Sequence, residues 1–106
     1  MFERAPLPRI DSRGKIICEG DVIDLYVPND GGKKPYTHER QLVWFSEEDC
    51  SFQICTRFFR KEILAPIPSQ EAFDEFDSRI IGNVYDDPSL RETLESKEID
   101  EKEIPK

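Results

Sequence analysis

The sequence contains few of the residues from which catalytic and metal sites are usually built. It has one histidine, His38, and three cysteines, none of them in a C-x-x-C pair. A zinc site made from these residues would need ligands brought together from distant parts of the chain. We therefore expect no metal and no other cofactor, and we interpret Cys18, Cys50 and Cys55 as reduced thiols that pack as small apolar side chains.

Long apolar runs are also missing. No stretch approaches the roughly 18 residues required to span a bilayer, and the first ten residues, broken by two prolines, do not resemble a signal peptide. The glycines in Asp30–Lys34 lack the strand-loop-helix spacing of a phosphate-binding loop. These absences favour a cytoplasmic protein with no membrane contact and no nucleotide site.

Positive charge is scarce towards the end of the chain. The net charge is −8; residues 1–61 carry ten Lys/Arg and ten Asp/Glu, whereas residues 62–106 carry five and thirteen. Nucleic acids and anionic membranes bind cationic surfaces, so this balance argues against both as partners. The acidic part can instead bind a basic partner or keep the protein soluble. An acidic DNA mimic that inhibits a nucleic-acid-binding protein is an alternative hypothesis.

The sequence does contain a series of short β-strand patterns separated by turn residues. The expected strands cover residues 15–18, 22–27, 39–46, 51–59 and 76–86. The clearest unit is the hairpin formed by 39–46 and 51–59, in which Phe52 and Ile54 share one face. Pro66 and Pro68 exclude residues 61–70 from a central strand position.

We predict a mostly β fold, a small SH3-like barrel with one short C-terminal helix. The helix is expected to begin at Pro88, which follows two aspartates that can cap it. Residues 1–10 are expected to form an extended lead-in and residues 11–95 the barrel domain. Residues 96–106 are mostly charged, and we expect them to fray.

The stretch GKIICEGDVIDLYV places three carboxylates beside two glycines. Asp21 and Asp24 would point to opposite faces of a strand, which does not suit a catalytic pair. The alternating oxygen ligands of a calcium loop are absent. We interpret the stretch as a corner, in which Gly20 adopts a positive φ and Asp21 binds its own turn, while Asp24 faces water. A metal-dependent enzyme using Asp21, Asp24 or His38 is the less favoured hypothesis, because His38 is expected in an exposed loop or at the start of a strand and has no recognisable set of catalytic partners.

Two motifs carry a resemblance to a known family. DSRGKIICEGDVI resembles the motif D-x-N-G-K-x-I-x-E-G-D-I-V of the YopX family of phage and prophage proteins, and IIGNVYDDPSL resembles the closing I-G-N-I-Y-x-N-P-E-L-L of the same family. Both occur in the family's order, and the resemblance covers about residues 10–94. Arg13 and Asp87 stand where the family usually has asparagine, and the N-terminal segment common in the family is shorter here.

The resemblance implies an SH3-type barrel encoded by a phage or prophage, with no established activity and no catalytic residues. We interpret its motif positions as backbone-shaping; they are Gly14, Gly20, Asp21, Gly82, Asn83, Tyr85 and Pro88.

The sequence therefore predicts a phage or prophage accessory protein in the cytoplasm of a bacterial host, a protein-interaction module rather than an enzyme. Trp44, Phe58 and Phe59 are candidates for the interaction surface, with core packing as the alternative. Phe58 and Phe59 are adjacent and point to opposite faces of a strand. One of them is therefore expected to be exposed or covered by a second copy of the chain, whereas the identity of any other protein partner is open.

Overall fold

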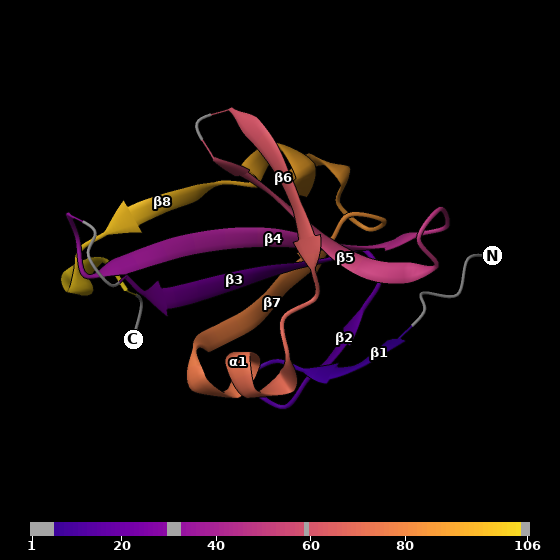
Figure 1. Cartoon of the computed structure of the whole chain (residues 1–106), viewed down its shortest axis with the longest axis horizontal. Helices are drawn as coiled ribbons and strands as arrows, with labels where there is room; N and C mark the ends of the chain where they lie inside the picture. Colours follow the sequence, from indigo (N-terminus) through magenta and orange to yellow (C-terminus); the bar gives the residue numbers. More distant parts are fainter. Residues whose placement is uncertain (1–5, 30–32, 59, 105–106) are drawn as a thin grey trace.

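The computed structural model describes residues 6–29, 33–58 and 60–104 and shows a mostly β chain whose strands pair antiparallel (Figure 1). The strands are β1 (Pro6–Ile10), β2 (Ile16–Cys18), β3 (Asp21–Pro28), β4 (Tyr36–Ser46), β5 (Ser51–Phe58), β6 (Lys61–Pro66), β7 (Asp77–Asn83) and β8 (Ser96–Ile99). The helical segments are α1 (Gln70–Glu75) and two short 3-10 segments, η1 (Pro88–Thr93) and η2 (Glu101–Glu103). The predicted mostly β composition is confirmed.

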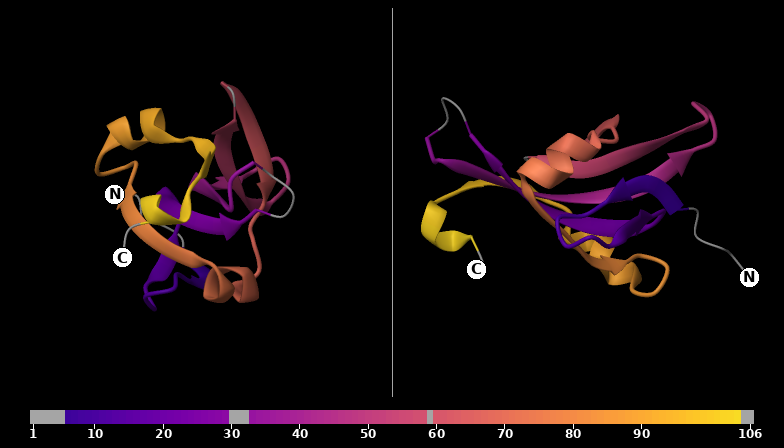
Figure 2. Two further views of the ribbon diagram at one scale, coloured as in Figure 1. Left: turned by 90° about the vertical axis from the view of Figure 1, so that its left-hand side faces the viewer. Right: turned by 90° about the horizontal axis from the view of Figure 1, so that it is seen from below.

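The main sheet has the order β6-β5-β4-β3-β7, and β8 lies beside β4 as an additional neighbour. The predicted hairpin is confirmed as β4 and β5. β6 was not among the expected strands, but it is terminal, which agrees with the exclusion of this proline-containing segment from a central position. The β5–β6 hairpin is turned steeply against the rest of the sheet (Figure 2). The end strands β6 and β7 do not pair with each other within the described residues. The sheet is therefore open, and the closed barrel that we expected is not formed.

The outer edge of β7 is covered by the turn between β1 and β2, which is one reason why the sheet stays open there. The N–H of Ser12 donates to the carbonyl of Ser78 at 3.0 Å, and the N–H of Ile80 donates to Asp11 Oδ2 at 3.1 Å. Asp11 is 2% exposed, and its other oxygen accepts from two N–H groups of its own turn. The N-terminal hairpin thus protects an edge that would otherwise be free to pair with another strand.

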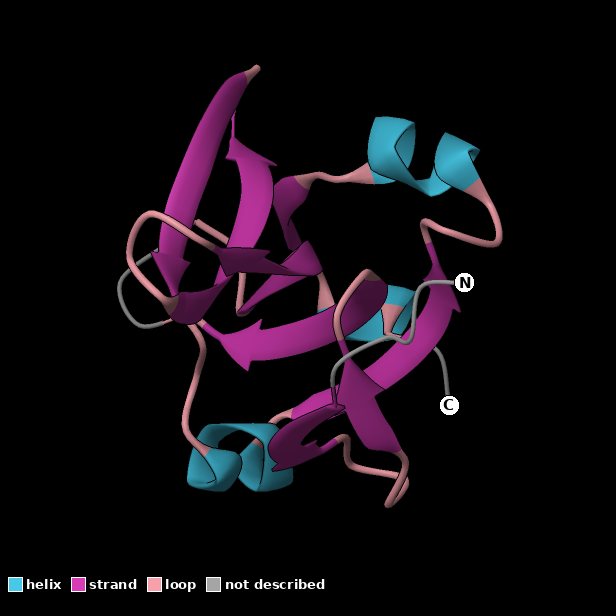
Figure 3. Ribbon diagram, turned by 90° about the vertical axis from the view of Figure 1, so that its right-hand side faces the viewer, coloured by secondary structure: helices cyan, strands magenta, loops and turns pink. Residues whose placement is uncertain are grey.

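Each face of the sheet buries its own apolar cluster, because successive residues of a strand point to opposite faces. The first cluster is Leu7, Ile17, Ile23, Leu25, Val43, Ile54 and Phe73. The second is Val22, Leu42, Cys55, Val84 and Leu94. α1 covers the first face and η1 the second, so they lie on opposite sides of the sheet (Figure 3). Burying a side chain such as Phe73 contributes roughly 1.5–3 kcal/mol.

α1 was not expected from the sequence, because its first residue follows closely after Pro66 and Pro68. It begins after Ser69, whose hydroxyl accepts from the N–H of Ala72 at 3.3 Å. The single turn and a half of helix inserts Phe73, which is 0% exposed, into the core between the sheet and the β1–β2 hairpin.

The C-terminal part differs from its prediction. The helix expected at Pro88 is only the six-residue 3-10 segment η1, in which the carboxylate of Asp87 accepts from the N–H of Ser89 at 3.2 Å. The chain then returns to the sheet as β8, so the prediction that residues 96–106 fray is wrong for Ser96–Ile99. Ile99 lies opposite Tyr36 and is 3% exposed, and this burial repays the ordering of a strand whose other residues are polar.

Candidate functional site

At Arg40, the strand that pairs with one edge of β4 changes from β5 to β8. Residues 42–46 of β4 pair with β5, and residues 36–39 pair with β8 on the same edge. The N–H of Arg40 donates to the carbonyl of Glu95 at 2.9 Å, while its carbonyl accepts from Thr56 Oγ1 at 3.0 Å. β5 and β8 therefore diverge from one edge of β4 and leave an open wedge between them. We call this wedge the β5–β8 fork.

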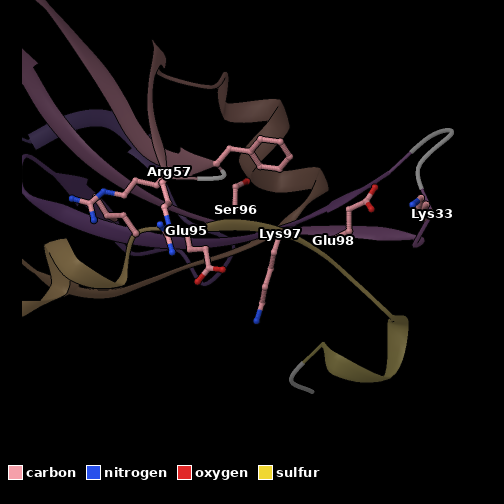
Figure 4. Close-up of a pocket in the computed structure, with 9 residues that line it drawn as sticks. Lys33, Arg57, Glu95, Ser96, Lys97 and Glu98 are labelled. Atoms are coloured by element: carbon pink, nitrogen blue, oxygen red, sulfur yellow. The ribbon is translucent and has the colours of Figure 1, made fainter.

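The fork holds a pocket of about 800 Å³ (Figure 4), within the size range of pockets that bind small ligands and peptide segments. It is lined by Lys33, Arg57, Phe58, Arg60, Leu94, Glu95, Ser96, Lys97 and Glu98. Four of these side chains are cationic and two are anionic, in a chain whose net charge is −8. Phe58 contributes a ring that is 39% exposed, and Leu94 is buried at the base. The pocket thus combines apolar surface with a local surplus of positive charge.

One wall of the fork is a free strand edge. Arg40 and Glu95 are joined by a backbone hydrogen bond, and in an antiparallel ladder such pairs alternate with pairs that are not hydrogen-bonded. The N–H and C=O groups of Ser96 and Glu98 consequently point away from β4 and into the fork. Within the described residues β8 pairs with β4 alone, so this edge can accept a further strand.

The side chains of β8 alternate in the same way. Ser96 and Glu98 point to one side of the strand and Lys97 to the other (Figure 4). Phe58 shares the sheet face of Ser96 and Glu98, whereas Arg57 shares the face of Lys97, as follows from the strand registers. The fork therefore has one face with an aromatic ring and the Glu98 carboxylate, and one face with two cations and the Glu95 carboxylate.

A polar cluster lies next to the base of the fork. Asp24, on β3, is 4% exposed, and its Oδ1 accepts from Arg40 Nε at 2.9 Å and lies 3.2 Å from His38 Nε2. The ring of His38 stacks on that of Tyr26 with the centroids 4.7 Å apart. Burial favours the neutral acid, but hydrogen bonds from His38 and Arg40 and their charges outweigh it, so the pKa of Asp24 lies below its ordinary value. Asp24 is thus a stable carboxylate that holds Arg40 at the branch point.

The prediction for Asp24 is therefore wrong, because Asp24 does not face water. Of the two placements expected for His38, the strand start is the one observed, since His38 is the third residue of β4. The sequence could not show the burial of Asp24, because it results from the pairing of β3 with neighbouring strands and not from local residues.

Asp21 belongs to a different place, the corner predicted from the sequence. Its Oδ2 accepts from the N–H of Cys18 at 2.7 Å and its Oδ1 from Asn83 Nδ2 at 3.0 Å. Gly20 has a φ of +87°, as expected. Asp24 and His38 are in contact, but Asp21 binds other residues, and the described part of the chain holds no group of three His, Cys, Asp or Glu residues placed to bind a metal.

The two motifs that resemble the YopX family meet in space. Besides the Asp21–Asn83 contact, the hydroxyl of Tyr85 donates to Glu19 Oε1 at 2.7 Å, and the N–H of Val84 donates to the carbonyl of Gly20 at 2.9 Å. The remaining motif positions also shape the backbone. Gly14 has a φ of +82°, Gly82 borders a shift of register between β7 and β3, and Pro88 opens η1.

The other candidate residues are distributed as follows. Trp44 is half-buried against the second apolar cluster, Phe58 lines the fork, and Phe59 lies outside the described residues. Only one cysteine packs as the sequence predicts: Cys55 is buried, whereas Cys18 is half-buried and Cys50 is exposed.

The buried thiol is also poorly suited to nucleophilic chemistry. Burial, together with a hydrogen bond to the Glu62 carboxylate and its charge, raises the pKa of Cys55 to about 12. A thiol is a nucleophile only as the thiolate, so Cys55 is inert at neutral pH.

Comparison with known proteins finds no relative: no family model, no curated protein and no solved structure matches the chain. The resemblance to the YopX family stays a prediction. None of the helices in the described residues is long and apolar enough to cross a bilayer.

Proposed function

We propose that this chain is a non-enzymatic protein-interaction module of a phage or prophage, related to the YopX family and acting in the cytoplasm of a bacterial host. The observation that carries the proposal is the β5–β8 fork, where a free strand edge lies beside an exposed aromatic ring and a local surplus of cations. Domains that bind extended protein segments use such edges for main-chain hydrogen bonds and the adjoining pocket for specificity.

An enzymatic role has less support. Catalytic acids and bases need a site open to substrate and a pKa near the working pH. The Asp24 carboxylate is buried against Arg40 and His38, and its pKa is lowered rather than raised towards neutrality. Cys55 remains protonated at neutral pH. These groups stabilise the sheet instead of forming a reactive centre.

The DNA-mimic alternative also has less support, because carboxylates near the end of the chain bind residues of the same chain. Lys34 Nζ lies 3.9 Å from both Asp100 and Glu103, and Glu98 accepts from Asn29 Nδ2 at 2.7 Å. A phosphate mimic would instead present its carboxylates to a partner.

The family and fold assignments are parts of the same proposal. Two motifs about sixty residues apart in the chain form one hydrogen-bonded corner, as expected if they are a single structural unit of a YopX-like fold. The steep turn of the β5–β6 hairpin is the curvature on which an SH3-like barrel depends, although the described strands leave the sheet open.

The proposal is tested on a purified partner, identified by affinity capture from bacteria that carry the parent phage or prophage. Its affinity is measured for the wild type, for Phe58→Asp in the fork, and for Ile16→Asp, a matched control on β2 that is 57% exposed. We expect Phe58→Asp to weaken binding at least about tenfold and Ile16→Asp to leave it unchanged. Equal affinities for all three proteins, or the absence of any direct partner, would overturn the proposal.

A further inference from the structure

The geometry points to the chemistry of the partner: we propose that it supplies an extended acidic segment that pairs antiparallel with β8 inside the fork. This inference rests on the proposed function and deepens it, since it names the kind of segment that the fork binds. It is carried by the backbone groups, the charges and the two unlike faces of the fork.

The backbone groups define how the segment binds. Ser96 and Glu98 each direct one N–H and one C=O into the fork, at the two-residue spacing of an antiparallel ladder. A strand that pairs with both residues satisfies four backbone groups without any rearrangement of β8. Because β8 has four residues, the bound segment is expected to form about four residues of strand.

The charges select an acidic segment. Among the described residues no carboxylate forms an ion pair with Arg57 or Lys97, whereas Glu98 already accepts from Asn29 at 2.7 Å. The residue of the bound strand that lies opposite Lys97 has its Cβ about 4.5–5.5 Å from that of Lys97, so an acidic side chain there pairs with it. Arg57 adds a second cation on the same face, which also carries the carboxylates of Glu95 and of Glu62, the residue directly opposite Arg57 on β6.

The other face of the fork selects an apolar residue. Side chains of the bound strand alternate between the faces, and those that do not point towards Lys97 point towards the side of Phe58. The expected partner segment therefore alternates acidic and apolar residues.

A second copy of β8 is a poorer occupant. A two-fold pairing that uses the outward groups of both Ser96 and Glu98 places Lys97 directly opposite Lys97 of the other copy. Like charges directly opposite each other destabilise a strand pair. The fork is thus better matched to a different, acidic chain.

The test is a selection with the full-length protein from a displayed library of random eight-residue peptides, followed by binding measurements on synthetic copies of the selected peptides. We expect the selected peptides to be enriched in Asp and Glu at alternate positions. In 15N spectra of the labelled protein, the amide signals of Ser96 and Glu98 should shift on peptide binding, whereas that of Lys97, already bonded to β4, should shift less.

Two matched pairs of variants separate the backbone from the charge contribution. Glu98→Pro removes an outward N–H, and Glu98→Ala keeps it while removing the same carboxylate; we expect at least about tenfold weaker peptide binding for Glu98→Pro than for Glu98→Ala. Arg57→Glu should weaken binding about tenfold, whereas Lys61→Glu, the same change outside the fork, should have little effect. Lys97→Glu provides a second test within β8 that does not depend on a proline being tolerated.

The outcomes distinguish this inference from the proposed function. Selected peptides that are neutral or basic, or that bind Glu98→Pro and Glu98→Ala with equal affinity, would overturn the inference that the partner supplies an acidic strand. The proposed function as a protein-interaction module would not be affected by that result. Failure to select any peptide would also overturn the inference. The titration of the intact partner against Phe58→Asp tests the proposed function separately.

Discussion

Gly20 occupies a position where a side chain meets two obstacles. Its φ is +87°, and a Cβ added there would lie 2.6 Å from Tyr85 Cε2 and 2.9 Å from Asn83 Oδ1. We expect Gly20→Ala to destabilise the protein by roughly 1–2 kcal/mol for the left-handed backbone and by a further ~1–3 kcal/mol for the crowding. The midpoint of chemical denaturation measures this loss.

Gly14 provides the control, because its φ is +82° but a Cβ there would have nothing within 4 Å. Gly14→Ala should therefore show only the backbone penalty. If both variants unfold at the same denaturant concentration, the crowding at the Gly20 corner contributes nothing and the two motifs are not tightly joined there.

The stability lost when Asp24 is replaced is expected to depend on pH. Asp24→Asn removes the negative charge from Arg40 and His38, and we expect a loss of about 1.5–3 kcal/mol in unfolding free energy at neutral pH. The pKa of Asp24 is lower in the folded than in the unfolded protein, whose value is about 3.8. The charge therefore stabilises the fold fully at pH values well above 3.8, and this stabilisation is lost as the pH falls through the lower folded-state pKa.

Denaturation of the wild type and Asp24→Asn over a range of pH checks this. The difference between the two proteins should shrink as the pH falls below about 3.8. A difference that does not change with pH would show that the lost stability comes from packing and not from the charge of Asp24.

At the residue scale, local chemistry was predictable and burial was not. Gly14, Gly20 and Asp21 act within their own turns, so a few neighbouring residues were sufficient to assign them. Asp24 and His38 lie 14 residues apart and meet only because β3 and β4 pair. No local pattern distinguishes such an ionised side chain from one that faces water.

At the scale of elements, β8 is the strand on which the site depends. Truncation after Glu95 removes the buried Ile99 and one wall of the fork, and we expect it to lower the unfolding free energy by at least about 2 kcal/mol. Thermal or chemical unfolding of the truncated protein measures the change.

Truncation after Asp100 is the matched control. It keeps β8 and Asp100 and removes η2, in which Glu103 forms one exposed ion pair with Lys34 at 3.9 Å, so the expected change is below about 1 kcal/mol. If the two truncated proteins were equally stable, β8 would add nothing to the sheet and would be a poor wall for a binding site.

The elements that the sequence did not reveal share one physical feature. β8 has four residues of which one is a large buried hydrophobe, and α1 has six residues with only Phe73 buried. Each buries one large apolar side chain and has no repeated apolar pattern that a sequence could reveal. The β4–β5 hairpin, by contrast, carries its alternation and its turn in one continuous stretch and was predicted correctly.

The fork could not be predicted for a related reason. It exists because β5 and β8 follow one edge of β4 on either side of Arg40, and β8 arrives there from more than fifty residues further along the chain. The sequence indicated Phe58 as an interaction residue, but two of the four cations in the pocket, Lys33 and Lys97, come from separate segments.

At the scale of the whole molecule, net charge and exposed apolar surface oppose each other. The chain carries a net charge of −8, which makes two copies repel. The β5–β6 hairpin nevertheless exposes Ile63 and Leu64, at 42% and 54%, on the terminal strand of the sheet. Such an edge favours pairing with a second copy once the repulsion is reduced.

Salt should therefore act in opposite directions on the two surfaces. Raising the salt from about 0.05 M to about 0.5 M shortens the screening length from above 10 Å to below 8 Å, which should strengthen self-association through β6 and weaken the binding of acidic peptides in the fork. Light scattering measures the first effect and peptide titration the second.

Leu64→Lys should abolish the salt-induced association, whereas Ile16→Lys, which adds the same charge on β2, should not. A protein that stays monomeric at both salt concentrations would show that β6 does not pair, and peptide binding that strengthens with salt would show that the fork does not act through its cations.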